Sequence, residues 1–207
     1  TYGVDFLELE AVPAQKAAPT NSLSVTDYGA TPNDQTDDLA AFYSCLNAAQ
    51  AAGKNVYIPA GRFMLSDRLD FNYNNLKFQG AGIWHTEIFF STDLQFTGGI
   101  LARASGVEIS DFSLNTANND RFHYGETNPK YSNVHGEPYK IYKGFMGTYG
   151  SGSRIHDVWV EHFECGFWIA GYDPPYPIDI TTDLIISRAR IRNNYADGVN
   201  FCQGTNN

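Results

Sequence analysis

Two short segments near the C-terminal end of the chain carry residue types that could bind and act on a sugar. They read CGFWIA at 165–170 and DGVNFC at 197–202. If the apolar residues that alternate along each segment face a core, Trp168 and Asn200 point outward together, with Asp197 at the corner before its strand. An indole ring offers a stacking surface, an amide forms hydrogen bonds, and a carboxylate can transfer a proton. The sequence therefore predicts a sugar site around the Asp197 carboxylate, with Trp168 and Asn200 as candidate substrate-binding residues.

A single carboxylate is half of a glycoside-cleaving site, because hydrolysis needs a proton donor for the leaving oxygen and a base for water. By itself, Asp197 before Gly198 is more typical of a turn residue than of a catalyst. His156 and Asp157 lie inside a strand repeat, so we expect them at ordinary strand positions. Three titratable residues close to Cys165 lack the spacing of a metal site, namely Glu161, His162 and Glu164. The sequence therefore predicts no metal ligands.

Two polar and aromatic loops interrupt the strand pattern, at 116–142 and 172–181. Long loops on a rigid scaffold are where binding residues are usually found. The alternative is that each loop is an ordinary surface excursion. The candidate substrate-binding residues of these loops are His123, Tyr124, Tyr172, Asp173 and Tyr176.

A repeat predicts the scaffold that positions these residues. The segments 109–114 (ISDFSL), 155–160 (IHDVWV) and 186–191 (ISRARI) all have apolar residues at positions 1, 4 and 6. A second repeat, Gly followed by an apolar residue, recurs at Gly144, Gly166 and Gly198, and removal of the loop at 172–181 brings its two intervals to the same length. Two short strands per repeat indicate an all-β fold, a right-handed, single-stranded parallel β-helix. A β-sandwich would need more hairpin turns than the single Asp-Gly pair supplies.

The N-terminal part of the coil is predicted to contain one α-helix, from about Asp37 to Ala52. Its apolar residues lie on one stripe, Gly53 ends it, and Thr36 or Asp34 could cap it. A short strand is expected at Val25. The helix would close the N-terminal end of the β-helix.

The predicted domain organisation has three parts. Residues 1–12 (TYGVDFLELEAV) alternate like a strand, which we interpret as the last strand of a preceding β-sandwich domain. Residues 13–22 are small, contain proline and lack periodicity, as a linker does. Residues 23–207 are the N-terminal part of a parallel β-helix catalytic domain that continues beyond the chain.

Composition and charge narrow the partners. The formal net charge of −9 argues against nucleic acid and favours a neutral polymer over an anionic one. No run of 18 apolar residues occurs, so no membrane partner is expected. The three cysteines suggest buried free thiols rather than a disulfide framework. We expect a monomer.

Residues 25–82 resemble the opening segment of the pectin-lyase-like superfamily, through VTDYGA, QTDDLAAF, NVYIPAGRF and KFQGAG. The later segments WVEHFECGFWIAGY and ARIRNNYADGVNFCQGTNN are similar to glycoside hydrolase family 87, the bacterial α-1,3-glucanases (mutanases) and mycodextranases. The superfamily match is specific for fold and weak for activity, since lyases, hydrolases and phage depolymerases share it.

The family resemblance implies an inverting hydrolase that uses three aspartates. Asp197 matches one of them, in the ADGVNF segment, and the other two are expected as an adjacent pair about one coil further on, beyond Asn207. The chain is thus expected to be a segment of a secreted, endo-acting enzyme on α-1,3-glucan, inactive by itself. No cofactor is expected, and the residues do not assign a structural calcium ion.

Two other functions remain open from the sequence. A polysaccharide lyase on the same fold would usually need calcium, or an Arg or Lys base beside the carboxylate, and no basic cluster is evident beside Asp197. A non-catalytic carbohydrate-binding or structural β-helix would have regular coils without the two loops. The next coil after Asn207 would discriminate, because an acidic pair there favours the hydrolase.

Overall fold

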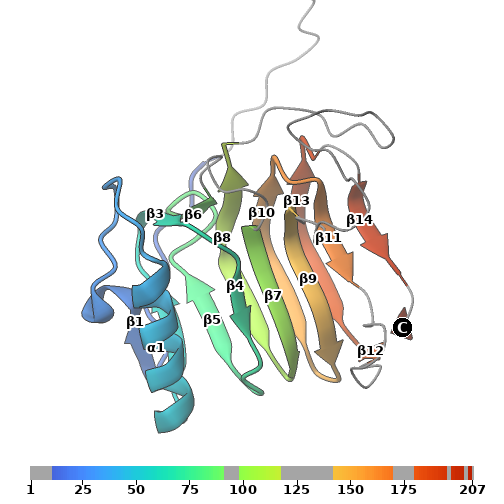
Figure 1. Cartoon of the computed structure of the whole chain (residues 1–207), viewed down its shortest axis with the longest axis horizontal. Coiled ribbons are helices and arrows are strands. Elements are labelled where there is room, and N and C mark those ends of the chain that lie inside the picture. Colours follow the sequence, from blue (N-terminus) through green and yellow to red (C-terminus); the bar gives the residue numbers. More distant parts are fainter. Residues whose placement is uncertain are drawn as a thin grey trace, which may run out of the picture.

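A computed structural model describes residues 11–90, 98–117, 142–169, 180–194, 197–202 and 205–206, which coil into a stack of parallel strands (Figure 1). Two sheets run along the stack, and all their strand pairs are parallel. Sheet A follows the order β1-β2-β5-β8-β10-β13, with β6 pairing to β8 and β3 to β6; sheet B follows β14-β11-β9-β7-β4. The predicted all-β parallel β-helix is confirmed.

The strand bounds of sheet A are β1 Ser22–Ser24, β2 Asn55–Ile58, β3 Gly61–Leu65, β5 Lys77–Gly80, β6 Thr86–Phe90, β8 Glu108–Thr116, β10 Arg154–Glu161 and β13 Ile185–Arg192. Those of sheet B are β4 Leu69–Phe71, β7 Gly98–Ser105, β9 Tyr142–Gly150, β11 Cys165–Ile169 and β14 Asp197–Phe201. A small third sheet joins β12 (Thr181–Thr182) and β15 (Thr205–Asn206).

The predicted repeats are the rungs of the coil. Ile155 on β10 pairs with Ile109 on β8 and with Ile186 on β13, and the apolar positions 4 and 6 of the three segments follow in the same register. The third position of each segment, Asp111, Asp157 or Arg188, has a positive φ of 49–69°. This shared left-handed residue bends each strand at the same level, so that the first half of β8 pairs with β5 and the second half with β6.

Phenylalanine rings stack through the interior from one coil to the next. Phe78, Phe112, Phe145 and Phe167 are all fully buried. Successive ring centroids in this series lie 5.7, 6.2 and 5.0 Å apart. Each ring comes from a different strand, so the series joins sheet A to sheet B inside the coil.

The N-terminal end of the coil is closed by α1 (Leu39–Ala52), seen beside β1 at the left of Figure 1. Phe42 enters the core and its ring centroid lies 5.8 Å from that of Phe63. Gly53, with φ 62°, forms the predicted C-terminal stop. The predicted capping by Thr36 or Asp34 is wrong: the N-cap residue is Asp38.

Local hydrogen bonds explain the different start of the helix. The Asp34 carboxylate accepts from the backbone and hydroxyl of Thr36, which closes a turn before the helix. The Asp38 carboxylate accepts instead from the amides of Thr31 and Met64 and joins the helix start to β3. Burial raises the pKa of Asp38, and these amide hydrogen bonds oppose the rise.

The strand expected at Val25 is displaced. The strand β1 ends at Ser24, and the 3₁₀ turn η1 (Val25–Tyr28) follows, closed by Gly29 at φ 103°. Val25 is nevertheless fully buried, because the turn directs it into the core. A buried apolar residue in a tight turn can therefore be mistaken, from the sequence, for a residue of a short strand.

Residues 13–19 of the predicted linker lie against sheet A, and they form no helix or strand; nor do residues 11 and 12, the end of the predicted strand. The backbone of Lys16 bonds to Ala81 and to the hydroxyl of Tyr57, and its ammonium group pairs with Asp111. The rest of the strand predicted over 1–12, residues 1–10, lies outside the described residues. The described part contains no helix that is long and apolar enough to cross a membrane.

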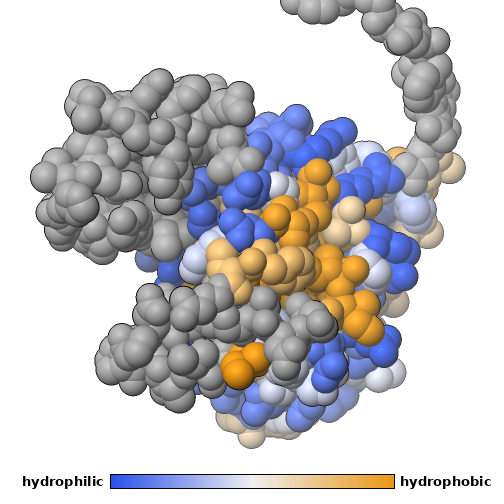
Figure 2. All heavy atoms as spheres, turned by 90° about the vertical axis from the view of Figure 1, so that its right-hand side faces the viewer, coloured by the Kyte–Doolittle hydropathy of each residue, from blue (hydrophilic) through white to orange (hydrophobic). Residues whose placement is uncertain are grey.

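The opposite end of the coil is apolar at its surface (Figure 2). Val199 and Phe201 on β14 stack in register on Phe167 and Ile169, as predicted, yet they are 44% and 50% exposed. In the described residues β13 and β14 are the last strands of their sheets. Val199 and Phe201, which align with core residues of the preceding coil, are therefore not covered by a further coil in the described residues.

Candidate active site

The candidate site lies on sheet B, where β11 pairs with β14 on one side and with β9 on the other. Trp168 stands directly opposite Asn200, and Cys165 directly opposite Asp197. The Asn200 amide donates to the Asp197 carboxylate at 3.1 Å between Nδ2 and Oδ2. The structure thus brings the three residues together, as the repeat predicted; their roles in binding and catalysis remain predictions.

Asp197 begins β14, at the corner where the chain enters the strand. Its backbone amide donates to the carbonyl of Glu164 at 3.2 Å, which fixes the corner against the coil below. Its side chain is exposed, and Asn200 is partly buried. The Asn200 Oδ1 accepts from the Cys202 thiol at 2.8 Å, so both ends of the amide are held and its NH₂ group is directed at Asp197.

A lysine and a glutamate that the sequence analysis did not assign also lie here. Lys143 on β9 is the register partner of Cys165, so the order Lys143, Cys165, Asp197 runs across three adjacent strands. The Lys143 Nζ lies 2.9 Å from a Glu164 oxygen and 5.8 Å from the centroid of the Trp168 ring. Lys143, Cys165 and Asp197 each immediately precede a glycine of the repeat, so extending that repeat by one position would have found Lys143.

Cys165, which lies between Lys143 and Asp197 in the strand register, is a neutral thiol. Cys165 is buried, and burial raises its pKa to about 12, against an opposing effect of Lys143. A thiolate nucleophile is therefore disfavoured at this position. Its thiol donates to the carbonyl of Phe167, within its own strand.

The arrangement offers an exposed carboxylate with a fixed amide donor, an indole surface one rung away, and a lysine paired to a second carboxylate. Asp197 can give or take a proton at its free oxygen while Asn200 holds the other. Glu164 is bound to Lys143 and so is not free to act as a base without breaking that pair. This site can supply one of the two carboxyl groups that glycoside hydrolysis needs.

Other titratable residues that the sequence analysis considered take structural roles. The Asp157 carboxylate binds Arg188 and His156. The group of Glu161, His162 and Glu164 is dispersed, since Glu161 binds Arg192, His162 bonds to Asn115, and Glu164 binds Lys143. Across the described ranges, no three His, Cys, Asp or Glu side chains gather as a metal site would require.

The remaining predicted binding residues are in the two loops. His123, Tyr124, Tyr172, Asp173 and Tyr176 lie outside the described residues.

Comparison with known proteins places this geometry among carbohydrate-active β-helices. Residues 22–196 match the family model described as rhamnogalacturonase A/epimerase, pectate lyase-like. The mannuronan C5-epimerase AlgE2 of Azotobacter vinelandii is 34% identical over 99 residues, which cover 44% of this chain and 10% of that protein.

Two solved structures are similar over most of the chain. The catalytic domain of Agl-KA is 44% identical with a TM-score of 0.80, covering 95% of this chain and 34% of that one. The catalytic unit of a thermostable glycoside hydrolase family 87 α-1,3-glucanase from Streptomyces thermodiastaticus strain HF3-3 is 27% identical with a TM-score of 0.69, covering 95% of this chain and 31% of that one. This chain therefore spans about a third of each domain. The predicted resemblance to glycoside hydrolase family 87 and to the pectin-lyase-like superfamily is confirmed.

Proposed function

We propose that this chain, which belongs to the rhamnogalacturonase A/epimerase, pectate lyase-like family, forms part of a catalytic β-helix. The enzyme would be a secreted glycoside hydrolase that cuts internal bonds of α-1,3-glucan. The observation that carries the proposal is the placement of Asp197, Asn200 and Trp168 on adjacent coils. Similarity to the Agl-KA catalytic domain and to an α-1,3-glucanase supports this class of hydrolase and its substrate. The net charge of −9 supports a neutral polymer.

The proposed reaction is inverting hydrolysis. One carboxyl group protonates the glycosidic oxygen, and another removes a proton from a water molecule that attacks the anomeric carbon from the opposite face. Asp197 would be one of these groups, and an aspartate pair beyond Asn207 would contribute the other. The Trp168 ring would stack on a glucose unit, and Asn200 would fix the direction of the Asp197 carboxylate.

A second candidate is an epimerase or lyase that acts on a uronate polymer. Its support is the AlgE2 similarity and the presence of Lys143 near Trp168 and Cys165, since a lysine can serve as a base in such chemistry. Against it, Lys143 is 8% exposed and its ammonium group is bound to Glu164. Proton abstraction would first require that this pair open.

Product analysis of the full-length protein separates the two candidates. The protein is incubated with α-1,3-glucan and, separately, with polymannuronate. The hydrolase predicts new reducing ends from the glucan, without ultraviolet absorbance from unsaturated sugars, and with the β-anomer appearing first by proton NMR. Unsaturated or epimerised products from polymannuronate, with no release from glucan, would contradict the proposal.

A further inference from the structure

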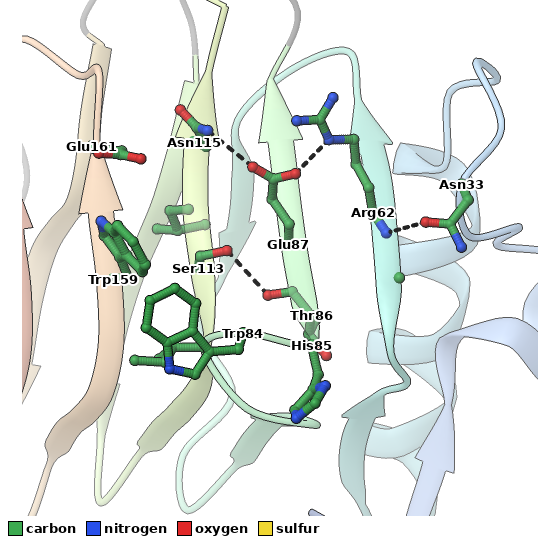
Figure 3. Close-up of a pocket in the computed structure, with 13 residues that line it drawn as sticks. Asn33, Arg62, Trp84, His85, Thr86, Glu87, Ser113, Asn115, Trp159 and Glu161 are labelled. Carbon is green, nitrogen blue, oxygen red and sulfur yellow. Dashed lines mark hydrogen bonds and ion pairs between the residues drawn. The ribbon is translucent and has the colours of Figure 1, made fainter. Parts of the chain in front are cut away.

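A cavity lies on sheet A, on a different sheet from Asp197, and nothing in the proposed reaction uses it. Figure 3 shows it above β3, β6, β8 and β10. Its volume is about 340 Å³, within the range of about 300–1,000 Å³ typical of small-ligand sites. We name it the indole groove, defined by Arg62, Trp84, Glu87, Asn115, Trp159 and Glu161.

The register of the strands aligns the groove in a row. Arg62 pairs with Glu87, Glu87 with Ser113, and Ser113 with Trp159, on four neighbouring strands. With about 4.8 Å between neighbouring strands, this row extends over roughly 14 Å. A row of that length, perpendicular to the strands, suits an elongated ligand of several linked units.

Two indole rings form the apolar wall of the groove. Trp84 lies in the turn before β6, and its ring centroid is 4.9 Å from that of Trp159, at 86° between the planes. Trp84 is 40% exposed, and in Figure 3 its ring is seen broadside while that of Trp159 is turned more edge-on. The Arg190 guanidinium lies 5.1 Å from the Trp84 centroid and 5.6 Å from that of Trp159, which holds the two rings in place.

The indole nitrogen of Trp159 is a buried donor without a hydrogen-bond partner. An indole N–H can only donate, so it needs an acceptor, and a buried donor left unpaired is unfavourable. In Figure 3 this nitrogen is on the side of the ring toward Glu161. A ligand oxygen in the groove would supply the missing acceptor.

The polar wall of the groove is rigid and its charges are paired. Glu87 accepts from Asn115 at 2.9 Å and is paired with Arg62. Glu161 is paired with Arg192 at 3.1 Å. Because each carboxylate is paired with an arginine, this wall offers no unopposed charge to select an ionic ligand, whereas a neutral ligand with hydroxyl groups could bond to the remaining lone pairs. Flat aromatic surface together with fixed planar polar groups suits the alternating apolar and hydroxyl faces of a sugar ring.

We infer that the indole groove is a second binding site for a neutral oligosaccharide, one that holds a chain of the polysaccharide on the sheet A face away from the reacting bond. The choice of an α-1,3-linked glucan chain as ligand rests on the proposed function. The groove itself is independent of Asp197, because the two lie on different sheets of the coil. Its role is to keep a polymeric substrate near the enzyme between cleavages.

The test uses the three tryptophans of the chain, two of which line the groove while Trp168 lies at the candidate active site. The full-length protein carrying Asp197→Asn, so that the probe is not consumed, is labelled with ¹⁵N. Single Trp→Phe variants assign the indole N–H resonances of Trp84, Trp159 and Trp168. An α-1,3-linked glucose tetrasaccharide is the probe, and a tetramer of mannuronate is the anionic comparison.

The resonances of Trp84 and Trp159 should shift in a saturable way with the glucose tetrasaccharide, the Trp159 proton moving downfield as it gains an acceptor. Replacement Trp84→Ala should weaken the Trp159 curve about tenfold while the Trp168 curve is unchanged, and Trp168→Ala should leave the Trp84 and Trp159 curves unchanged. If Trp84→Ala fails to fold, the titration of the protein with Trp84 and Trp159 intact still tests whether the groove binds the oligosaccharide.

Three results would overturn the inference. Unmoved groove resonances while Trp168 saturates would refute the second site and leave the proposed function standing. Stronger shifts with the mannuronate tetramer would refute the neutral ligand. Groove resonances that are unchanged by both probes would refute oligosaccharide binding and favour a protein segment as the occupant of the cavity. Saturable groove binding, together with no glucan hydrolysis by the full-length protein that retains Asp197, would refute the proposed function alone.

Discussion

Asn200 is the residue that gives the candidate site a defined geometry. Its amide is held between the Cys202 thiol and the Asp197 carboxylate, so one oxygen of the exposed Asp197 is engaged. A carboxylate restricted in this way presents a single oxygen to a substrate. Trp168, one rung away, would fix the sugar against which that oxygen acts.

Trp168→Ala should raise the KM for glucan about tenfold in the full-length protein, because the loss of one stacked ring removes roughly 1.4 kcal/mol of binding. Trp168→Phe, which keeps a flat ring, should recover most of it. Initial rates across substrate concentration test this. An unchanged KM in the alanine variant would remove Trp168 from the binding site.

Asp157 should make stability depend on pH in acid. The Arg188 side chain, at 2.6 and 2.7 Å, holds the pKa of Asp157 well below its ordinary value. A carboxylate with a lowered pKa adds stability above its unfolded-state pKa of about 4, and that stability declines as pH falls below it. Asp157→Asn should therefore destabilise the protein at pH 6–7 and match the wild type more closely toward pH 2. Urea midpoints across this range would show a constant difference if Asp157 were not involved.

Two glycines are required for different reasons, one to end a helix and one to let two strands approach. Gly53 ends α1 with φ 62°, and a Cβ atom there would meet nothing. Gly147 on β9 has φ 113°, and a Cβ atom there would lie 2.0 Å from the carbonyl oxygen of Ala102 on β7. The first glycine is needed for backbone conformation alone, and the second also for the approach of two coils.

Gly53→Ala should cost about 1–2 kcal/mol, the penalty of a left-handed conformation for a residue with a side chain. Gly147→Ala should cost about 3 kcal/mol or more, because the clash is with backbone and cannot be relieved by a rotamer change. Urea denaturation of both variants measures the difference. Equal costs would contradict the close approach of β7 and β9.

Elements with a repeating pattern were predictable, and those set by single contacts were not. The rungs at 109–114, 155–160 and 186–191 were found because every coil must bury the same inward positions. The helix start was displaced because Asp38 is held by Thr31 and Met64, a tertiary contact that capping preferences do not include. The shared bend was missed, since an Asp or Arg in a left-handed conformation leaves no compositional signal.

The candidate site divides in the same way. Asp197 and Asn200 followed from their strand, and Lys143 could have followed from the glycine repeat extended by one residue. The indole groove could be inferred only in part. Trp159 occupies the outward position 5 of its rung, but Trp84 comes from a turn whose path depends on the pairing of β6 with β8.

The whole molecule is stabilised as a stack, in which each coil contacts its neighbours. The phenylalanine series from Phe78 to Phe167 joins four strands, and Phe112 lies in its middle, fully buried. Phe112→Ala should destabilise the protein by about 3–5 kcal/mol, through lost burial and a cavity that neighbouring coils cannot fill. Tyr57→Phe, which removes an exposed hydroxyl contact with Lys16, is the control and should cost far less. Similar urea midpoints for both variants would argue against a stacked core.

The stack also explains why the candidate site includes one carboxylate on β14. Neighbouring coils present the same position at the same edge, so a coil beyond β14 would place its own residues beside Asp197. The proposed aspartate pair would occupy such a coil.

The most direct test of the account is the hydrolysis of α-1,3-glucan by the full-length protein with Asp197→Asn. Asp183→Asn is the matched control, since Asp183 is an exposed residue in the turn before β13. Loss of a general acid or base should lower kcat/KM about 100-fold or more for Asp197→Asn, with unchanged thermal stability, while the control retains wild-type rates. A folded Asp197→Asn variant with near-normal turnover would contradict the assignment of catalysis to this site.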